Sequence, residues 1–266
     1  MKIIEHFISI QGEGVRSGRP SLFIRVAGCN LRCVFRNSKG KVASICDTYY
    51  ASFENPEVNE TEEESLASVY ALLGQNPGVT DIVVTGGEPL LNQNDLYDLL
   101  VEIKRINPDL VTTIETNGTI DPKPELYKVV DLWSVSPKLS TSVPNEKDMK
   151  KYGLTEAQCK YHAEKRINAD ALANIIIHGN DTQLKFVYSG EDCIDEIQNI
   201  KSRVQTKIDE SNCNDDVNRY IMLMPEGITN DAILGKSDEV VKVCINNGWT
   251  YTTRLHILIW GNVKEK

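Results

Sequence analysis

The sequence predicts an α/β fold, an open partial barrel of about six βα units that corresponds to an incomplete TIM-like barrel. Strand-like and helix-like stretches alternate along the chain, which is typical of parallel strands joined by helical crossovers. Polar or glycine-rich residues follow each strand-like stretch, at the end where a barrel carries its reactive loops. Six units fall short of the eight that close a barrel. We therefore expect one domain over residues 1–266, with insertions at 34–45 and 139–180.

Periodicity and capping signals place the elements in order. The predicted strands cover residues 21–27, 81–84, 110–114, 129–135, 182–188 and 220–225. A capping-box spacing at Thr61 predicts a helix that ends at Gly74, and apolar residues at helical spacing predict another near 94–103. The segment 139–180, rich in Lys, Glu and Ala, predicts one or two helices. The tail at 251–260 alternates weakly and predicts a last strand.

Composition excludes several classes of protein. Hydrophobic residues make up 41% of the 266 residues and charged residues 25%, as in ordinary globular proteins. A net charge of −9 argues against broad binding to a phosphate backbone, so we expect no direct nucleic-acid partner. The N-terminus lacks the apolar core of a signal peptide, and no apolar run approaches the roughly 20 residues that span a bilayer. We expect a cytoplasmic protein without a membrane partner.

Three cysteines, Cys29, Cys33 and Cys46, follow the first predicted strand within eighteen residues. Three thiolates suit an iron–sulfur cluster, and because a cubic cluster has four irons, one iron stays open to a ligand that is not protein. A structural zinc site is the alternative, but it usually has two ligand pairs and a fourth ligand close by. The other four cysteines, scattered from residue 159 to 244, are interpreted as buried thiols.

Other motifs leave two interpretations open. Gly86 and Gly87 follow a strand, where glycine allows either a tight turn or a close approach to a ligand. The stretch 11–14, Gln-Gly-Glu-Gly, is either a simple turn or a set of donors and acceptors for a polar heterocycle. Arg25 lies in an apolar strand and either binds a carboxylate or forms an internal salt bridge. His256, between two apolar residues, is more typical of a structural histidine.

Together these motifs resemble the radical S-adenosylmethionine superfamily and, within it, the 7-carboxy-7-deazaguanine synthase family. The resemblance runs through most of the chain, and the order of the motifs and their placement at strand ends agree with it. The matching stretches are residues 8–14 (ISIQGEG), 23–25 (FIR), 28–33 (GCNLRC), 46–48 (CDT), 85–89 (TGGEP), 115–118 (ETNG) and 136–138 (SPK).

The resemblance implies three cofactors. Cys29, Cys33 and Cys46 would hold a 4Fe-4S cluster, whose fourth iron would bind S-adenosyl-L-methionine, and Thr48 would ligate Mg²⁺ through its hydroxyl. The implied contacts to S-adenosylmethionine are Gly87, Ser136, Pro137, Lys138 and Gln183.

The resemblance also implies the reaction, the conversion of 6-carboxy-5,6,7,8-tetrahydropterin to 7-carboxy-7-deazaguanine with loss of ammonia. Such an enzyme is a carbon–nitrogen lyase of the queuosine and 7-deazapurine pathway. The implied substrate-binding residues are Ile10, Gln11, Gly12, Glu13, Arg25, Thr85 and His256. Glu13, Glu115 and His256 would be catalytic. Implied partners are an electron donor such as a flavodoxin or ferredoxin and a second copy of the chain in a homodimer.

One departure concerns the spacing of the cysteines. The superfamily usually has two residues between its second and third cysteines, whereas twelve separate Cys33 from Cys46 here. The inserted residues are polar and contain glycine, so we expect a surface loop that leaves the thiolates in place. Two other functions stay open at this point: an activating enzyme that makes a glycyl radical on a partner protein, and a non-enzymatic zinc-binding module.

Overall fold

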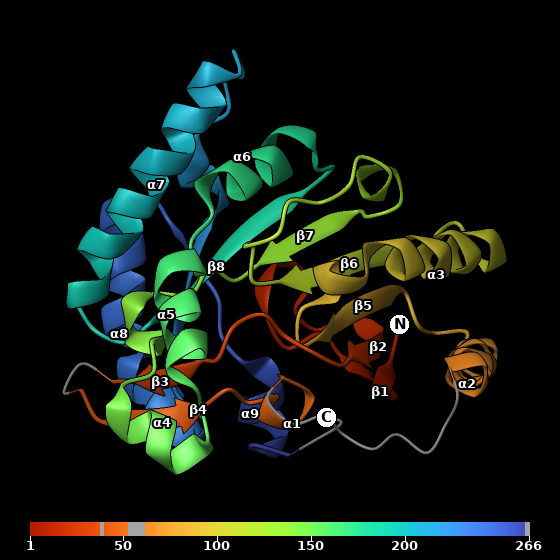
Figure 1. Ribbon diagram of the computed structural model, residues 1–266. Helices are drawn as coiled ribbons and strands as arrows, with labels where there is room; N and C mark the ends of the chain where they lie inside the picture. Colours follow the sequence, from red (N-terminus) through yellow and green to blue (C-terminus); the bar gives the residue numbers. More distant parts are fainter. Residues whose placement is uncertain (38–39, 53–61, 264–266) are drawn as a thin grey trace.

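The computed structural model describes residues 1–37, 40–52 and 62–263 of the chain, and its largest feature is a twisted sheet with helices packed along it (Figure 1). The strands are β1 (Ile3–Ile10), β2 (Pro20–Val26), β3 (Val34–Arg36), β4 (Val42–Ile45), β5 (Asp81–Gly86), β6 (Val111–Thr116), β7 (Leu132–Val135), β8 (Thr182–Tyr188), β9 (Ile221–Pro225) and β10 (Thr250–Tyr251). The α-helices are α1 (Tyr49–Ser52), α2 (Glu62–Gln75), α3 (Gln93–Ile106), α4 (Glu146–Tyr152), α5 (Glu156–Lys165), α6 (Ala169–His178), α7 (Asp192–Glu210), α8 (Asn230–Asn247) and α9 (Leu255–Trp260). Short 3-10 helices cover Gly14–Arg16, Pro89–Asn92, Leu126–Lys128, Ser140–Ser142 and Val217–Tyr220.

The main sheet is open and has the order β1-β2-β5-β6-β7-β8-β9-β10. All neighbours run parallel except β1, which pairs with β2 in the antiparallel direction. The six predicted strands correspond to β2 and β5 to β9, so the predicted α/β class and the open sheet are confirmed. Strand β1 was not among the predicted strands. It forms one edge of the sheet, and the two-residue β10 forms the other.

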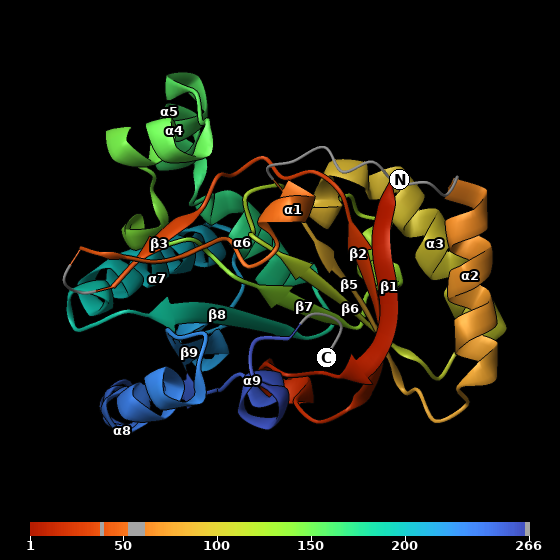
Figure 2. The same cartoon turned by 90° about the horizontal axis from the view of Figure 1, so that it is seen from below.

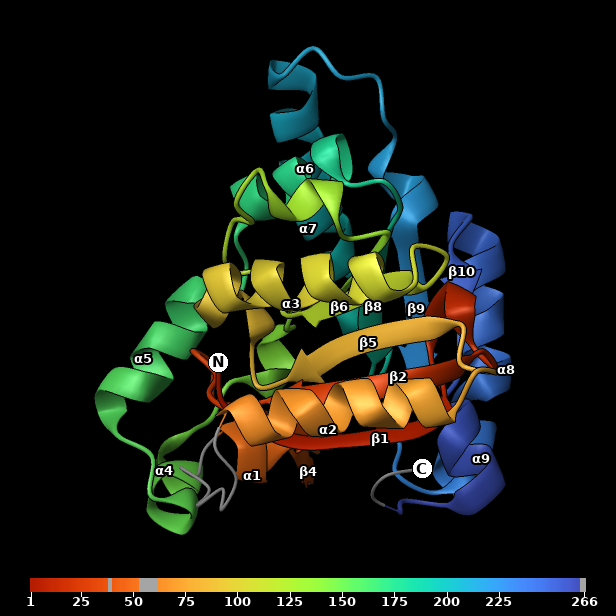
Figure 3. The ribbon, with the colours of Figure 1, turned by 90° about the vertical axis from the view of Figure 1, so that its right-hand side faces the viewer.

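Alternation along the strands separates an apolar face from a polar face. Even-numbered β2 residues such as Leu22 and Ile24 are wholly buried in the apolar core, as are Ile114 in β6 and Phe186 in β8. Helices α2 and α3 cover this face beside β2 and β5, as Figure 3 shows from the side. In α3 the apolar residues recur at helical spacing and supply Leu96, Leu99, Leu100 and Ile103 to the core. The other face is therefore left for polar side chains.

The remaining short elements lie across that polar face. Helix α1, the separate hairpin β3–β4 and helix α9 lie on the side of the sheet away from α3 and α6 (Figures 1 and 2). Strands β3 and β4 pair with each other in the antiparallel direction through Val34 and Ile45, and through Phe35 and Ser44. The predicted insertion at 34–45 is thus a hairpin. Within the described part of the chain, no helix is long and apolar enough to cross a bilayer.

Two predictions for the second half of the chain are wrong. The segment 139–180 holds three α-helices, not one or two, because Asn145, Thr155 and Asn168 each cap a separate helix through side-chain oxygens. The last of them, α6, is the crossover helix before β8. In the tail at 251–260, only Tyr251 belongs to a strand, β10, and six residues form the helix α9. Its run of apolar residues from Leu255 is too short for periodicity to separate the two. The predicted helix start at Thr61 lies outside the described residues.

Candidate active site

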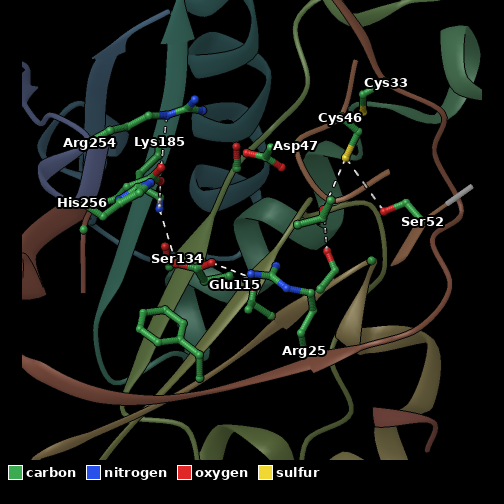
Figure 4. Close-up of a pocket in the computed structure, with 18 of the residues that line it drawn as sticks. Arg25, Cys33, Cys46, Asp47, Ser52, Glu115, Ser134, Lys185, Arg254 and His256 are labelled. Atoms are coloured by element: carbon green, nitrogen blue, oxygen red, sulfur yellow. Dashed lines mark hydrogen bonds and ion pairs between the residues drawn. The ribbon is translucent and has the colours of Figure 1, made fainter. Parts of the chain in front are cut away.

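The polar face of the sheet carries side chains that share one cavity of about 290 Å³. Arg25 of β2, Thr85 of β5, Glu115 of β6, Ser134 of β7 and Lys185 of β8 all line it. Each lies on the opposite face from the apolar residues next to it in its own strand, because successive side chains in a strand alternate. Figure 4 shows several of these side chains directed toward one another. The sheet thus collects polar groups from five strands at one place, and three of them, Arg25, Glu115 and Lys185, are charged.

The three predicted cluster ligands line the same cavity. Cys29 and Cys33 lie on the loop after β2, and Cys46 directly follows β4. The backbone N–H of Cys46 donates to the carbonyl of Cys33 across 3.1 Å, at the open end of the β3–β4 hairpin. The twelve residues between Cys33 and Cys46 therefore leave and return at one place, and the long spacing does not separate the two cysteines.

Burial keeps these thiols protonated in the protein alone. It raises the pKa of Cys29 to about 12 and also raises the pKa of Cys33 and of Cys46. Thiolates at this depth need a compensating positive charge, which iron ions would supply. Among the described residues no three His, Cys, Asp or Glu side chains converge on one metal ion. In a 4Fe-4S cluster each cysteine binds a separate iron, so three thiols that line one cavity fit such a cluster.

The glycine pair at the end of β5, Gly86 and Gly87, packs directly against the cysteine loop. The N–H of Gly87 donates to the carbonyl of Val26 across 3.0 Å, and the N–H of Glu88 donates to the carbonyl of Gly28 across 2.8 Å. A Cβ atom on Gly87 would lie 1.8 Å from the Gly28 oxygen. Glycine is therefore required at residue 87 so that the two loops approach each other. Gly86 and Gly87 also line the cavity.

The predicted contacts to S-adenosylmethionine divide into two groups. Gly87, Ser136 and Lys138 line the cavity, and the Lys138 ammonium donates to the Ser136 hydroxyl across 2.9 Å. Pro137 and Gln183 are outside the lining residues. The Gln183 amide is buried, donates to Ser134 Oγ across 2.8 Å and accepts from the N–H of Val15 across 2.9 Å.

Two carboxylates and two cations meet over the centre of the sheet. Lys185 Nζ lies 2.9 Å from Glu13 Oε2 and 3.8 Å from Glu115 Oε1. Arg254 Nε lies 3.3 Å from Glu13 Oε1. The Thr85 hydroxyl donates to Glu115 Oε2 across 2.8 Å. Glu13 and Glu115 thus share the buried Lys185 ammonium, and both carboxylates reach the cavity.

The charges of this cluster fix its protonation. Burial by itself would raise the pKa of Glu13, but Lys185 and Arg254 lower it to about 2. The pKa of Lys185 is raised because Glu13 and Glu115 outweigh the effect of burial. Burial, with Arg254, lowers the pKa of His256. At neutral pH the cluster therefore combines ionised Glu13 and Lys185 with a neutral imidazole at His256.

Arg25 takes part in an internal salt bridge and also lines the cavity. Its Nε donates to Glu5 Oε1, which also accepts from the Tyr50 hydroxyl across 2.7 Å. Glu5 lies directly opposite Arg25 in the β1–β2 register. These neighbours raise the pKa of Arg25 against the opposing effect of burial. The salt-bridge alternative is therefore present in the structure, with the guanidinium still facing the cavity.

The Gln-Gly-Glu-Gly stretch forms one wall of the cavity and packs against α9. Gln11 Nε2 donates to Glu115 Oε1 across 3.2 Å, and Ile10, Gly12 and Glu13 also line the cavity. The N–H of Leu255 donates to the Gly12 carbonyl across 2.8 Å. A Cβ atom on Gly12 would lie 1.9 Å from His256 Nδ1, so glycine there admits the imidazole. His256 belongs to α9 and lines the cavity. Thr48, two residues after Cys46, also lines it.

Comparisons with known proteins agree with this geometry. Residues 10–159 match a family model described as a 4Fe-4S single cluster domain. A 7-carboxy-7-deazaguanine synthase from Halobacterium salinarum is 35% identical over 266 residues, covering 100% of this chain and 92% of the relative. The chain belongs to the 7-carboxy-7-deazaguanine synthase family. Relatives of the same name include those from Rhodopirellula baltica (33% identical, 98% of this chain and 86% of the relative) and Pyrobaculum aerophilum (29%, 100% and 97%).

A solved structure supports the fold of this synthase family member. The crystal structure of QueE from Escherichia coli aligns with a TM-score of 0.53 at 22% sequence identity, covering 96% of this chain and 93% of that one. The resemblance to the synthase family inferred from the sequence motifs is therefore confirmed, and the chain is an enzyme with an iron–sulfur cluster domain. The family assignment also decides against the zinc-binding module and the activating enzyme.

Three charged residues of the site were missed by sequence reasoning: Glu5, Lys185 and Arg254. Lys185 gave a usable signal, because it interrupts an apolar strand just as Arg25 does. Glu5 lies on β1, and without that strand its pairing with Arg25 had no basis. Arg254 comes just before α9, in a segment that was predicted to be extended.

Proposed function

We propose that this synthase family member converts 6-carboxy-5,6,7,8-tetrahydropterin to 7-carboxy-7-deazaguanine with loss of ammonia, which makes it a carbon–nitrogen lyase. One observation carries the proposal: three cysteine thiols and a cluster of charged groups open into the same cavity. The cysteines suit a redox cofactor, and the charged cluster suits a polar heterocycle with a carboxylate. The relatives that match this chain over its whole length are named for the same product.

Cys29, Cys33 and Cys46 would hold the 4Fe-4S cluster. When bound, the cluster and S-adenosylmethionine supply a carbon-centred radical to the cavity. Gly87, Ser136 and Lys138 are the proposed contacts to S-adenosylmethionine, and they lie on the loops after β5 and β7. Pro137 and Gln183 would act without lining the cavity. Pro137 would restrict the backbone between Ser136 and Lys138. Gln183 would hold the Ser134 side chain through its 2.8 Å hydrogen bond.

The edge of the pterin carries N–H donors, which require acceptors in one plane. Glu13 and Glu115 are acceptors, and Lys185 keeps Glu13 ionised so that it cannot act as a donor. Gln11 adds an amide beside Glu115, and Ile10, Gly12 and Thr85 complete the wall. The stacked rings of Phe7 and Phe23, with centroids 5.2 Å apart, line the same cavity and provide an apolar surface for a flat ring system.

The other end of the substrate carries its carboxylate. Arg25 would pair with this group through the guanidinium atoms that Glu5 leaves free, because an Arg fork matches a carboxylate. Thr48 would bind Mg²⁺ together with substrate and water, in keeping with the few protein ligands that Mg²⁺ takes. His256 has a neutral imidazole at neutral pH and is suited to accept a proton as the product becomes aromatic.

The proposed reaction also implies partners. One electron must come from outside the chain, and a flavodoxin or ferredoxin is the proposed donor. We propose further that the enzyme is a homodimer and that its product enters the queuosine and 7-deazapurine pathway. The support for these points is the family membership of the chain.

Anaerobic reconstitution tests the proposal. Protein loaded with iron and sulfide is expected to be brown with four irons per chain. It should form 5′-deoxyadenosine and the deazapurine when given S-adenosylmethionine, a reductant, Mg²⁺ and the carboxypterin. Cys46→Ala should abolish both products, whereas Cys213→Ser, a change between α7 and β9 that is outside the cavity lining, should retain them. Formation of 5′-deoxyadenosine without the deazapurine would reject the substrate.

A further inference from the structure

His162 contacts the cysteine loop from a different part of the chain. It lies on α5, has no solvent exposure and is outside the lining residues of the cavity. The backbone N–H of Arg32, between Cys29 and Cys33, donates to His162 Nδ1 across 3.0 Å. On the other side of the ring, His162 Nε2 lies 3.0 Å from Ser142 Oγ. The imidazole therefore bridges the cysteine loop and the segment before α4.

The hydrogen bonds settle which ring nitrogen carries the proton. The Ser142 hydroxyl donates its one proton to the Leu139 carbonyl across 2.7 Å, so it must accept from His162 Nε2. Nδ1 is then unprotonated and accepts from Arg32. Burial, with Arg166, Lys138 and Arg32 as the charged groups that act on the ring, lowers the pKa of His162 to about 4. The ring stays neutral, and a second ring proton would face the Arg32 N–H.

Further contacts bind residues between 143 and 168 to both sides of the cysteine loop. The Arg36 guanidinium pairs with Asp148 of α4 and donates to the Val143 carbonyl across 2.8 Å. Asn168, the cap of α6, donates to the Thr119 carbonyl across 3.0 Å. The Asn30 amide donates in turn to Thr119 Oγ1 across 2.7 Å. Of these contacts, the one made by His162 is nearest to Cys33 in the sequence, because Arg32 directly precedes that cysteine.

The geometry points to His162 as a positioning residue for the iron–sulfur cluster: by accepting from the Arg32 N–H, it holds the loop between Cys29 and Cys33 in the conformation that retains the cluster. This inference rests on the proposed function, since it requires a cluster at these cysteines. Removing the acceptor would deprive the Arg32 N–H of this hydrogen bond, and the loop would no longer be held at that point. The residues from α4 to α6 then serve the cluster site, although they lie far from it in the sequence.

Iron release tests the inference without measuring turnover. Anaerobically reconstituted wild type, His162→Leu, His162→Asn and His178→Leu are mixed with a ferrous chelator, and the thermal midpoints of the cluster-free proteins are compared. His162→Leu removes the acceptor, so iron release should be roughly ten- to a hundredfold faster, the range typical for partners that orient metal ligands. His162→Asn keeps an acceptor oxygen near the position of Nδ1 and should release iron at close to the wild-type rate. His178 lies on the exposed end of α6 against Tyr127 and serves as the control.

The outcomes separate positioning from packing. Rescue by His162→Asn, together with an altered electron paramagnetic resonance spectrum in His162→Leu alone, supports the inference. Equal release from His162→Leu and wild type overturns it, as does equally fast release from the Leu and Asn variants. Should His162→Leu not fold, His162→Phe takes its place: it keeps a ring of similar size but has no acceptor, and a wild-type release rate from it overturns the inference. A wild type that binds no cluster contradicts the proposed function instead.

Discussion

Lys185 is the residue on which the electrostatics of the site depend. Its side chain is 4% exposed and extends from an interior strand of the sheet, where an unpaired charge is very costly. Glu13 and Glu115 compensate for it, and Arg254 adds a second cation beside Glu13. Removing one partner of such a buried pair strongly destabilises the folded protein, because the other charge stays buried without compensation. The free-energy cost of burying the Lys185 charge is thus offset only while its carboxylate partners are present.

Glu13→Gln should change how stability depends on pH. The pKa of Glu13 is lowered from 4.5 to about 2 in the folded protein, so its contribution is present above pH 4.5 and is lost as the pH falls toward 2. The advantage of wild type over Glu13→Gln should therefore shrink by roughly 3 kcal/mol between pH 6 and pH 2. Urea unfolding of the cluster-free proteins measures it. Glu164→Gln, an exposed change on α5, is the control. A constant difference between wild type and Glu13→Gln across this range would contradict the assignment.

The sequence indicated some charged residues of the site but not their partners. Arg25 was recognised because a charge in an apolar strand needs a partner, and the same argument applies to Lys185 in β8. The identity of the partner was out of reach in both cases. Glu5 and Arg25 are 20 residues apart, and Glu13 and Lys185 are 172 apart. Only the register of β1 on β2, and the position of residue 13 over the sheet, bring these pairs together.

At the scale of elements, the β3–β4 hairpin explains the unusual spacing of the cysteines. The ladder between Val34 and Ile45 and the hydrogen bond from Cys46 to Cys33 fix the open end of the hairpin. From that end β3 continues to Arg36, and β4 begins at Val42. A loop affects stability mainly through its closure entropy, which depends only weakly on its length. The number of residues between β3 and β4 therefore has little effect on the positions of Cys33 and Cys46.

Replacing residues 37–41 with a two-residue Asn-Gly turn should leave the cluster in place. Asn-Gly favours the turn that matches the twist of an antiparallel pair. The shortened protein should bind iron to within about 10% of wild type, because closure of a shorter loop changes the free energy of unfolding by only about 1 kcal/mol. Deletion of Ser44 is the contrasting variant, since it shifts Cys46 by one residue and turns its side chain to the other face of the hairpin. Loss of iron from the shortened protein would show that the connecting loop itself holds the site.

Helix α9 shows the limit of local patterns. Residues 255–260 are nearly all apolar, and a run of this length suits a strand or a buried helix equally. The deciding contacts are tertiary: the N–H of Leu255 pairs with Gly12, and Ile257 packs into the interior. In this helix His256 packs against Gly12, where a Cβ atom on residue 12 would lie 1.9 Å from the imidazole Nδ1.

For the molecule as a whole, one sheet connects both ends of the chain. Residues from Met1 to Trp249 share one apolar core, and β1 and β10 belong to the same sheet. The cavity collects groups from the first strands and from the residues after β10. We therefore propose that residues 1–266 form a single cooperative domain, in which the site cannot be assembled from either half alone.

A single unfolding transition is expected for the cluster-free protein. Trp133 is wholly buried in β7, and Trp249 lies before β10 at the far edge of the sheet. Two variants that keep one of these tryptophans each, the others being changed to Phe, report on the two regions by fluorescence. In each variant the fluorescence midpoint in urea should coincide with the midpoint of the far-ultraviolet circular dichroism signal. A Trp249 transition that precedes the loss of helix would divide the chain into two domains.

The sequence by itself determined the six parallel strands, the three clustered cysteines and the glycine-rich strand ends, because alternation, helical spacing and turn residues act over a few neighbouring positions. The tertiary structure alone decided that Glu5 pairs with Arg25, that Lys185 joins Glu13 to Glu115, and that His162 supports the cysteine loop. The physical reason is that the cost of burying a charge or a polar group is met by whichever group the fold brings near. That group lies on another strand or helix, far away in the chain.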